Sequence, residues 1–430
     1  MDLPLGWVPL CRKSFFSWHE TITDTFAKKL YAGLSTLNLG SKISSTMHTD
    51  RDKQIWLHEE FTEHHSHRVV FTNDLLRADN DVLATILARR DDEPVGGVLL
   101  VVDSNVADAW PTFADDFAQK LASFQGPTFR HAMRIPGGED SKNDPAVFDA
   151  LFNAIDSHHI DRASWVVVVG GGAAIDTAGL AAATAHRGVR LLRIATTVLA
   201  QLDAAIGVKN GVNRLGKKNF VGSFAIPEAV ICDESFLATL SDREWRCGFS
   251  EAVKIACLQS RDFLTKISHQ AEAIRARDMV AANGIIFECA ERHLKHITQG
   301  GDPFERREGR PLDFGHWSGH RLESMTNFSV KHGEAVAIGV AIDTLYSVLD
   351  DRLSEEDGEF VIATLESLGL PVYHETLNET EGILEGLEEF REHLGGRLTI
   401  TLLNSIGSPT DVHEMDHVKI REAIRLLATR

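Results

Sequence analysis

A group of acidic, basic and histidine residues in the second half of the chain has the composition of a metal site. Glu251 and Lys254 stand in GFSEAVK, and His316 and His320 stand four positions apart in DFGHWSGH, so a helix would place both imidazoles on one face. His332 opens a further helical pattern, KHGEAVAIG. One carboxylate with two imidazoles is a common zinc ligand set that leaves a position open for water or substrate. A lone histidine is more often structural, but three histidines so close together indicate a metal site.

A second group of residues has the composition of an anion pocket. Residues 195–219, ATTVLAQLDAAIGVKNGVNRLGKKN, are interrupted by glycines and rich in hydroxyl, amide and lysine side chains. The chain has a formal net charge of -18, so this local cluster favours a phosphate site over a solubilising surface. The polar residues of this segment that we single out are Thr196, Thr197, Asp203, Lys209, Lys217, Lys218 and Asn219.

A glycine-rich turn in the first half of the chain is a candidate dinucleotide site. In WVVVVGGGAAIDTAG, an apolar strand runs into Gly170, Gly171 and Gly172 and then into a helix, whose N-terminus would favour a pyrophosphate. The turn lacks the GxGxxG spacing, and glycine turns after strands are common, so alone it is a weak signal. Asp103 and Asn105 end another strand, where an acid can bind ribose hydroxyls or simply form an Asx turn.

These groups need a scaffold, and the chain changes character where the scaffold would change. Between Arg68 and Asp233, β-branched runs alternate with helical patterns, which predicts parallel strands with crossover helices. Beyond Ser235, long amphipathic segments follow, with no comparable strand before RLTITLL. We therefore predict an α/β fold: an extension (1–52), a Rossmann-like dinucleotide-binding domain (53–236) and a mainly α-helical metal-binding domain (237–430). The predicted strands are VVFT, GGVLLVVD, FRHAMRIP, WVVVVGGG, VRLLRIATT and AVICD.

Composition excludes several classes of function. The net charge of -18 disfavours a nucleic-acid partner, which requires a basic face. No run is long and apolar enough for a membrane span, and the N-terminus lacks the apolar core of a signal peptide. The five cysteines include no CxxC pair, so neither a disulfide framework nor a thiolate zinc site is indicated. We expect a cytoplasmic protein without nucleic-acid or membrane partners.

The three groups together fit redox chemistry on a phosphorylated polyol, and their motifs occur in a recognisable order. Over roughly residues 68–405, the chain resembles dehydroquinate synthase and the related sugar phosphate cyclases. The motifs that carry this resemblance are PGGEDSK, GGGAAID, RGVRLLRIATTVLAQLDAAIGVKNGVN, GKKN, CDESFLATL, GFSEAVK, DPFE, GH and KHGEAVAIG.

The resemblance implies a two-domain fold of the dehydroquinate synthase type and a role for each matching residue. It implies NAD and a divalent metal, zinc or cobalt, as cofactors. The implied metal ligands are Glu251, His316 and His332, with His320 beside the substrate. The implied NAD contacts are Asp103, Asn105, Glu139, Lys142, Gly171, Gly172, Asp176, Thr196, Thr197, Lys218 and Thr239. The implied substrate contacts are Asp203, Lys209, Asn219, Lys254 and Lys295, with Arg187 reaching the phosphate site of a second subunit in a homodimer.

The chain departs from dehydroquinate synthases where their substrate carboxylate would bind. GRPLDFGHWSGH places Gly309 and Asp313 where those enzymes have arginine and asparagine, although Arg310 or Arg391 could compensate. Because an uncompensated buried carboxylate is costly, we expect a neutral-headed substrate, sedoheptulose 7-phosphate, and a valiolone-type product. DFGHWSGH and EFREHLGG are also similar to the dehydroquinate synthase-like proteins of ebo-type gene clusters.

Three alternatives remain open at the level of sequence. The first is 3-dehydroquinate synthase itself. The second is a metal-dependent polyol dehydrogenase, which would share the glycine turn and metal histidines and would release NADH steadily. The third is a non-catalytic NAD-binding scaffold, which would release no phosphate.

Overall fold

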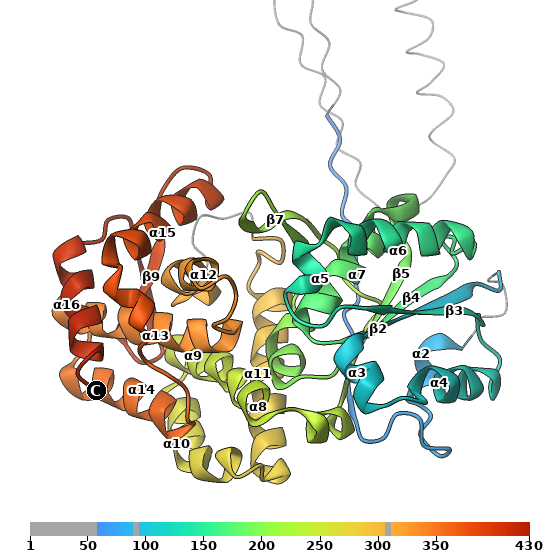
Figure 1. Cartoon of the computed structure of the whole chain (residues 1–430), viewed down its shortest axis with the longest axis horizontal. Coiled ribbons are helices and arrows are strands. Elements are labelled where there is room, and N and C mark those ends of the chain that lie inside the picture. Colours follow the sequence, from blue (N-terminus) through green and yellow to red (C-terminus); the bar gives the residue numbers. More distant parts are fainter. Residues whose placement is uncertain (1–57, 89–93, 306–310) are drawn as a thin grey trace, which may run out of the picture. The chain divides into compact units, whose positions relative to one another are not determined.

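The computed structural model describes residues 58–88, 94–305 and 311–430 (Figure 1). The predicted extension, residues 1–52, lies outside the described residues, as do Gly309 and Arg310. Residues 66–430 form one compact unit, in which an α/β part precedes a mainly helical part. The boundary between residues 236 and 237 stays a prediction, because both parts belong to that unit.

A six-stranded parallel sheet forms the centre of the α/β part. Its strands are β1 (Val69–Thr72), β2 (Gly97–Asp103), β3 (Thr128–Ile135), β4 (Trp165–Gly170), β5 (Arg190–Ala195) and β8 (Ala229–Asp233). Their order is β1-β8-β5-β4-β2-β3, and all six strands predicted from the sequence are confirmed. Strands β2 and β4 are buried along their whole length, as expected for a parallel sheet covered on both faces.

Helices cover both faces of this sheet. Alternate residues of each strand point to opposite faces, so neighbouring residues of one strand pack in different apolar clusters. Leu99 of β2 belongs to the same apolar cluster as Leu151, whereas Leu100 belongs to the cluster that contains Leu83 and Phe117. The first face is covered by α6 and α7, and the second by α2 and α4 (Figure 1). The helices of this part are α2 (Val82–Leu87), α3 (Ser104–Ala109), α4 (Phe113–Ala122), α5 (Asp140–Asn143), α6 (Pro145–Ser157) and α7 (Gly172–Thr184).

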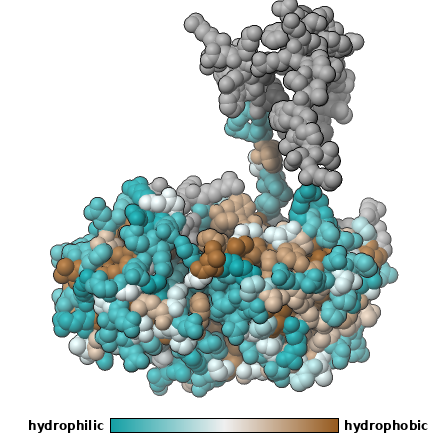
Figure 2. Space-filling model, turned by 45° about the horizontal axis from the view of Figure 1, so that its top comes forward, coloured by the Kyte–Doolittle hydropathy of each residue, from teal (hydrophilic) through white to brown (hydrophobic). Residues whose placement is uncertain are grey.

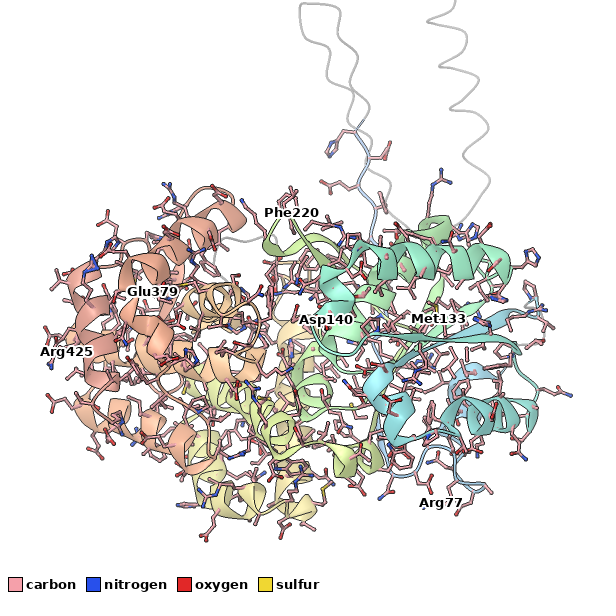
Figure 3. All side chains as sticks on the ribbon, viewed as in Figure 1. Arg77, Met133, Asp140, Phe220, Glu379 and Arg425 are labelled. Carbon is pink, nitrogen blue, oxygen red and sulfur yellow. The ribbon has the colours of Figure 1, made fainter. Side chains whose placement is uncertain are left out.

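A hairpin that the sequence did not predict follows β5. It consists of β6 (Lys209–Arg214) and β7 (Lys217–Phe224), joined through Leu215 and Gly216, both with positive φ. Its surface is partly apolar: Phe220, labelled on the hairpin in Figure 3, is 53% exposed. Figure 2 shows such apolar areas as isolated brown regions in a mainly hydrophilic surface.

The second part is mainly helical, as predicted. At its centre, α13 has a buried run of small and branched apolar residues, which lets neighbouring helices approach closely. A hairpin of β9 (Ile400–Ser405) and β10 (Ser408–Val412) closes the part; only β9 was predicted. Within the described ranges, no helix has the length and apolar character of a membrane span. The helices are α8 (Asp242–Cys247), α9 (Phe249–Gln259), α10 (Arg261–Arg275), α11 (Met279–Gln299), α12 (His316–Met325), α13 (His332–Leu349), α14 (Glu355–Ser367), α15 (Thr380–His393) and α16 (His417–Leu427).

Candidate active site

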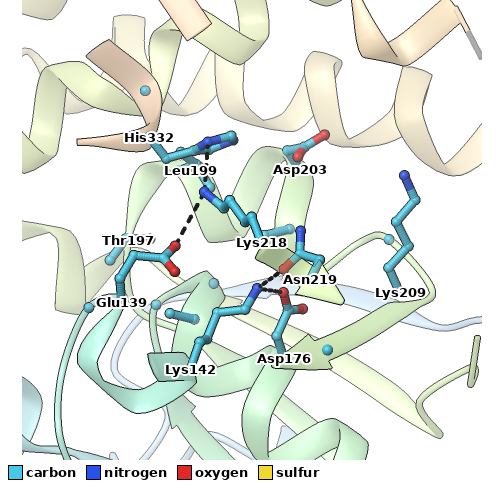
Figure 4. Close-up of a pocket in the computed structure, with 18 of the residues that line it drawn as sticks. Glu139, Lys142, Asp176, Thr197, Leu199, Asp203, Lys209, Lys218, Asn219 and His332 are labelled. Carbon is cyan, nitrogen blue, oxygen red and sulfur yellow. Dashed lines mark hydrogen bonds and ion pairs between the residues drawn. The ribbon is translucent and has the colours of Figure 1, made fainter. Parts of the chain in front are cut away.

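A cleft of about 1370 Å³ collects side chains from both parts. The carboxyl ends of β2, β4 and β5 supply Asp103, Gly171 and Thr196, as is usual for ligand sites in open parallel sheets. The helical part supplies α9, α12 and α13. Figure 4 shows Lys142, Lys209 and Lys218 in this cleft. The residues named from the sequence that line it are Asp103, Asn105, Glu139, Lys142, Gly171, Gly172, Asp176, Thr196, Thr197, Asp203, Lys209, Lys218, Asn219, Thr239, Lys254, Asp313, His316, His320 and His332.

Glu251, His316 and His332 converge with the separations that a metal ion requires. Glu251 Oε1 lies 3.6 Å from His316 Nε2 and 3.4 Å from His332 Nε2. Two ligands at tetrahedral angles and about 2.1 Å from zinc would be about 3.4 Å apart. The donor set and its spacing therefore fit a divalent metal ion, and two of its members, His316 and His332, line the cleft.

The protonation of these residues is set by burial and by neighbouring charges. Burial would raise the pKa of the Glu251 carboxyl, but Lys254, His332 and His316 outweigh it and hold that pKa well below its ordinary value. Burial and Lys254 lower the pKa of His316 to about 4, which leaves its imidazole neutral. His332 differs: burial would lower its pKa, but Glu323 and Glu251 raise it to about 9.

Glu323, which the sequence analysis missed, holds the other side of His332. Its carboxylate is fully buried, and Oε2 lies 3.1 Å from His332 Nδ1. The Lys218 ammonium donates to Glu323 Oε1 and lies 3.4 Å from Glu139 Oε1. His320, Glu323 and His332 also have metal-like spacing, but the Lys218 ammonium already supplies the cation there. The sequence signal that could have identified Glu323 is its spacing: it follows His320 by three positions, which places both side chains on one helix face.

The dinucleotide-like side of the cleft is built around the start of α7. Gly171, Gly172 and Ala173 line the cleft, so the N-terminus of α7, which has no side-chain cap, faces it. A Cβ on Gly171 would lie 3.2 Å from the Thr197 side chain, so a side chain here would crowd this wall. Asp103 accepts a hydrogen bond from the Asn105 N–H at 2.8 Å, and burial raises its pKa. Lys142 donates to Asp176 at 2.6 Å (Figure 4).

The opposite side of the cleft carries the residues assigned to substrate. Asp203 Oδ1 lies 3.0 Å from Nδ1 of His293, a buried residue that the sequence analysis did not select. Burial and Glu251 would raise the pKa of Asp203, but Lys254 and His293 lower it. Lys209 at the start of β6 pairs with Glu305 at 2.6 Å.

Among the residues named from the sequence, Lys217, Lys295 and Arg187 do not line the cleft. Lys217 is half exposed and pairs with Glu392 at 2.7 Å. Lys295 is half exposed on α11 and pairs at 2.8 Å with Glu291, one turn earlier on the same helix. Arg187 lies in a turn after α7, has φ 63°, and lines a separate hollow with Asp161 and Thr184. The cationic alternative Arg391 does not line the cleft either: it is exposed and pairs with its helical neighbour Glu388.

Comparison with known families gives two adjacent matches. The family models of the N-terminal and C-terminal domains of 3-dehydroquinate synthase match residues 132–247 and 248–389. The 3-dehydroquinate synthase of Halorhodospira halophila (strain DSM 244 / SL1) is 34% identical over 310 residues, which cover 72% of this chain and 84% of that protein.

Comparison with solved structures extends the likeness. The structure of 2-epi-5-epi-valiolone synthase from Streptomyces hygroscopicus subsp. jinggangensis 5008, with NAD+ and Zn2+ bound, has a TM-score of 0.78 at 26% identity, covering 86% of this chain and 99% of that one. A 2-deoxy-scyllo-inosose synthase complexed with carbaglucose-6-phosphate, NAD+ and Co2+ has a TM-score of 0.70 at 22% identity, covering 89% and 99%. The predicted α/β fold with a helical second part is thus confirmed.

Proposed function

Because the chain belongs to the 3-dehydroquinate synthase family of sugar phosphate cyclases, we propose that it converts sedoheptulose 7-phosphate to a valiolone-type carbocycle with release of phosphate. The observation that carries this proposal is the joint presence, in one cleft, of a metal-ligand group, a glycine turn at a helix N-terminus and lysines. A 26%-identical structure bears NAD+ and Zn2+, which supports the same cofactors here. A polyol dehydrogenase would not account for the family match.

Each side of the cleft has a separate task in this reaction. When bound, NAD supplies reversible hydride acceptance, and the metal ion supplies Lewis-acid polarisation of a hydroxyl group. Glu251, His316 and His332 would hold the ion, and the neutral His316 imidazole is ready to donate its lone pair. The start of α7 and Asp103 would bind the dinucleotide at its pyrophosphate and ribose.

Lys209 and Asn219 would hold the phosphate group of the substrate until it leaves. Lys209 projects into the same side of the cleft as Asp203 (Figure 4), and its charge suits a phosphate leaving group. Asn219 has φ 52° and receives a hydrogen bond on Oδ1 from Lys142, so its side chain is oriented. Loss of phosphate with no net change in NAD distinguishes this reaction from a simple dehydrogenation.

Asp313 is the basis for the choice of a neutral-headed substrate. It lines the cleft, and its charge acts on both His316 and Lys254 by raising their pKa values. A substrate carboxylate at this position would be repelled, whereas a hydroxymethyl group could donate a hydrogen bond to Asp313. This charge favours sedoheptulose 7-phosphate over the keto acid used by 3-dehydroquinate synthase, the leading alternative.

The test compares the two substrates at equal metal and NAD loading. We expect kcat/KM for sedoheptulose 7-phosphate to exceed that for 3-deoxy-heptulosonate 7-phosphate by at least about tenfold, or roughly 1.4 kcal/mol. The matched variant Asp313→Asn should narrow this ratio. A preference for the keto acid would overturn the substrate assignment and make the protein a 3-dehydroquinate synthase.

We also propose a cytoplasmic homodimer in which Arg187 reaches the phosphate site of the second subunit. The dimer is supported by Arg187, which lies in a surface turn away from its own cleft. The cytoplasmic location is supported by the four described cysteines, which are free and buried. Light scattering should give twice the chain mass of 47.5 kDa. A monomer with full activity would contradict this assembly.

A further inference from the structure

We infer that Asp343 is a positioning residue that fixes the metal ligand His316 from the neighbouring helix. The inference rests on the proposed metal site, whose ligands are His316 on α12 and His332 on α13. Asp343 also lies on α13, three turns after His332, and its side chain is fully buried. It touches no ligand itself, so any influence must pass through the turn that begins α12.

Both oxygens of Asp343 are used at that turn. Oδ2 accepts a hydrogen bond from the Gly315 N–H at 2.9 Å, and Oδ1 accepts one from the indole Nε1–H of Trp317 at 2.8 Å. These two donors belong to the residues immediately before and after His316. A single carboxylate therefore clamps the backbone on one side of the ligand and a large side chain on the other.

Steric contacts and one further hydrogen bond restrict the same turn. Gly315 has φ +78°, and a Cβ there would lie 2.6 Å from the Val340 N atom on α13. Next to it, the Phe314 carbonyl accepts from His316 Nδ1 at 3.1 Å. That hydrogen bond leaves Nε2 as the ligand atom, directed toward Glu251. The Phe314 carbonyl and the Gly315 N–H belong to one planar peptide group. The hydrogen bond between that group and Asp343 therefore also holds the carbonyl that selects the tautomer and direction of the His316 imidazole.

A carboxylate is an expensive way to fill this space, which argues for a specific role. A buried ionised group costs free energy unless it is hydrogen-bonded, and an apolar residue of similar volume would pack without that penalty. Burial raises the pKa of Asp343 to about 7 against the hydrogen bonds from Trp317 and Gly315. The acid gives two acceptors to two donors that an apolar side chain would leave unsatisfied.

The test measures metal affinity in Asp343→Asn, because this change replaces one of the two acceptor oxygens by an NH2 donor and leaves either the Gly315 N–H or the Trp317 indole N–H without its partner. The full-length apoprotein is titrated with Zn²⁺ against a chelator, and the visible spectrum of the Co²⁺ form reports the ligand geometry. We expect the Zn²⁺ Kd to rise by about 10-fold or more, the typical effect of losing an outer hydrogen-bond partner, with a changed Co²⁺ spectrum and an unchanged Kd for NAD.

Ser347→Ala is the matched control, because Ser347 lies one turn further along α13. Its hydroxyl donates to the Asp343 carbonyl and accepts from the Leu403 N–H, so the variant loses buried hydrogen bonds away from the turn. It should lower Tm and leave the Zn²⁺ Kd within about twofold. If Asp343→Asn does not fold, Trp317→Phe removes one donor alone and should weaken Zn²⁺ by about threefold.

Three outcomes would overturn the inference. One is an unchanged Zn²⁺ Kd and Co²⁺ spectrum in whichever of Asp343→Asn and Trp317→Phe folds. Another is an equal loss of Zn²⁺ affinity in Ser347→Ala, which would reduce Asp343 to general packing. The third is a wild-type protein that binds no metal, which would overturn the proposed function as well; the first two leave that function intact.

Discussion

Replacing His332 by alanine should remove the metal ion while the fold survives. His332 is the first residue of α13 and is partly exposed, so truncation deletes few packing contacts. Its loss leaves Glu251 and His316 as the remaining donors. Since losing an outer-shell partner already costs 10- to 100-fold in metal affinity, losing a direct ligand should cost at least about 100-fold, or roughly 2.7 kcal/mol.

The matched variant is His320→Ala, which removes a neighbouring imidazole from the same cleft. The His320 ring centroid lies 5.2 Å from that of His316 and 5.8 Å from that of His332, but the residue is outside the assigned ligand set. Metal content after dialysis, measured by atomic emission, should be near zero in His332→Ala and stoichiometric in His320→Ala. Stoichiometric metal in His332→Ala would refute the assignment. Loss of metal in both variants would favour the group of His320, Glu323 and His332 instead.

Two further predictions concern the phosphate side of the cleft and the buried acid on α13. Lys209→Ala and Asn219→Ala should each raise KM for the sugar phosphate by about tenfold and change the Kd for NAD by less than twofold, because both side chains are assigned to the substrate phosphate. Equal losses of substrate and NAD affinity, seen by titration of NAD, would make this hairpin a cofactor element. Burial raises the pKa of Asp343 to about 7, so between about pH 4 and pH 7 the native state binds a proton that the unfolded chain has released. As the pH rises through that window, the free energy of unfolding of wild type should fall relative to that of Asp343→Asn, by up to about 4 kcal/mol. Urea unfolding of both proteins across this range measures the difference, and parallel stability curves would contradict the shifted pKa.

The sheet could be predicted from the sequence because its strands carry a local signal. Val166 to Val169 form an unbroken β-branched run ended by glycine, which few structures other than a buried strand accommodate. The hairpin β6–β7 escaped prediction because Lys209, Lys217 and Lys218 dominate its composition. Its strands pair only with each other, and the buried residues 210–213 of β6 include a single apolar side chain, Val212, so no alternating apolar pattern marks the strand.

The site was predictable to the extent that its residues lie in recognisable motifs. His316, His320 and His332 stood out by spacing, but Glu323 and Asp343 did not, because their partners lie on other elements. Contacts such as Asp343 with Trp317 depend on how α12 packs on α13, which local spacing does not encode. Lys295 was chosen by its position in the family resemblance, but helix α11 places its side chain outside the cleft, whereas His293 of the same helix lines it.

The central claim is tested most directly by following phosphate and NADH in one reaction. The metal-loaded protein is incubated with NAD and sedoheptulose 7-phosphate, with free phosphate and the absorbance of NADH recorded together. A cyclase returns every hydride to the substrate, so phosphate should accumulate over many turnovers while NADH stays below one equivalent per active site. NADH that rises in step with substrate consumption, without phosphate, would show a polyol dehydrogenase and contradict the account.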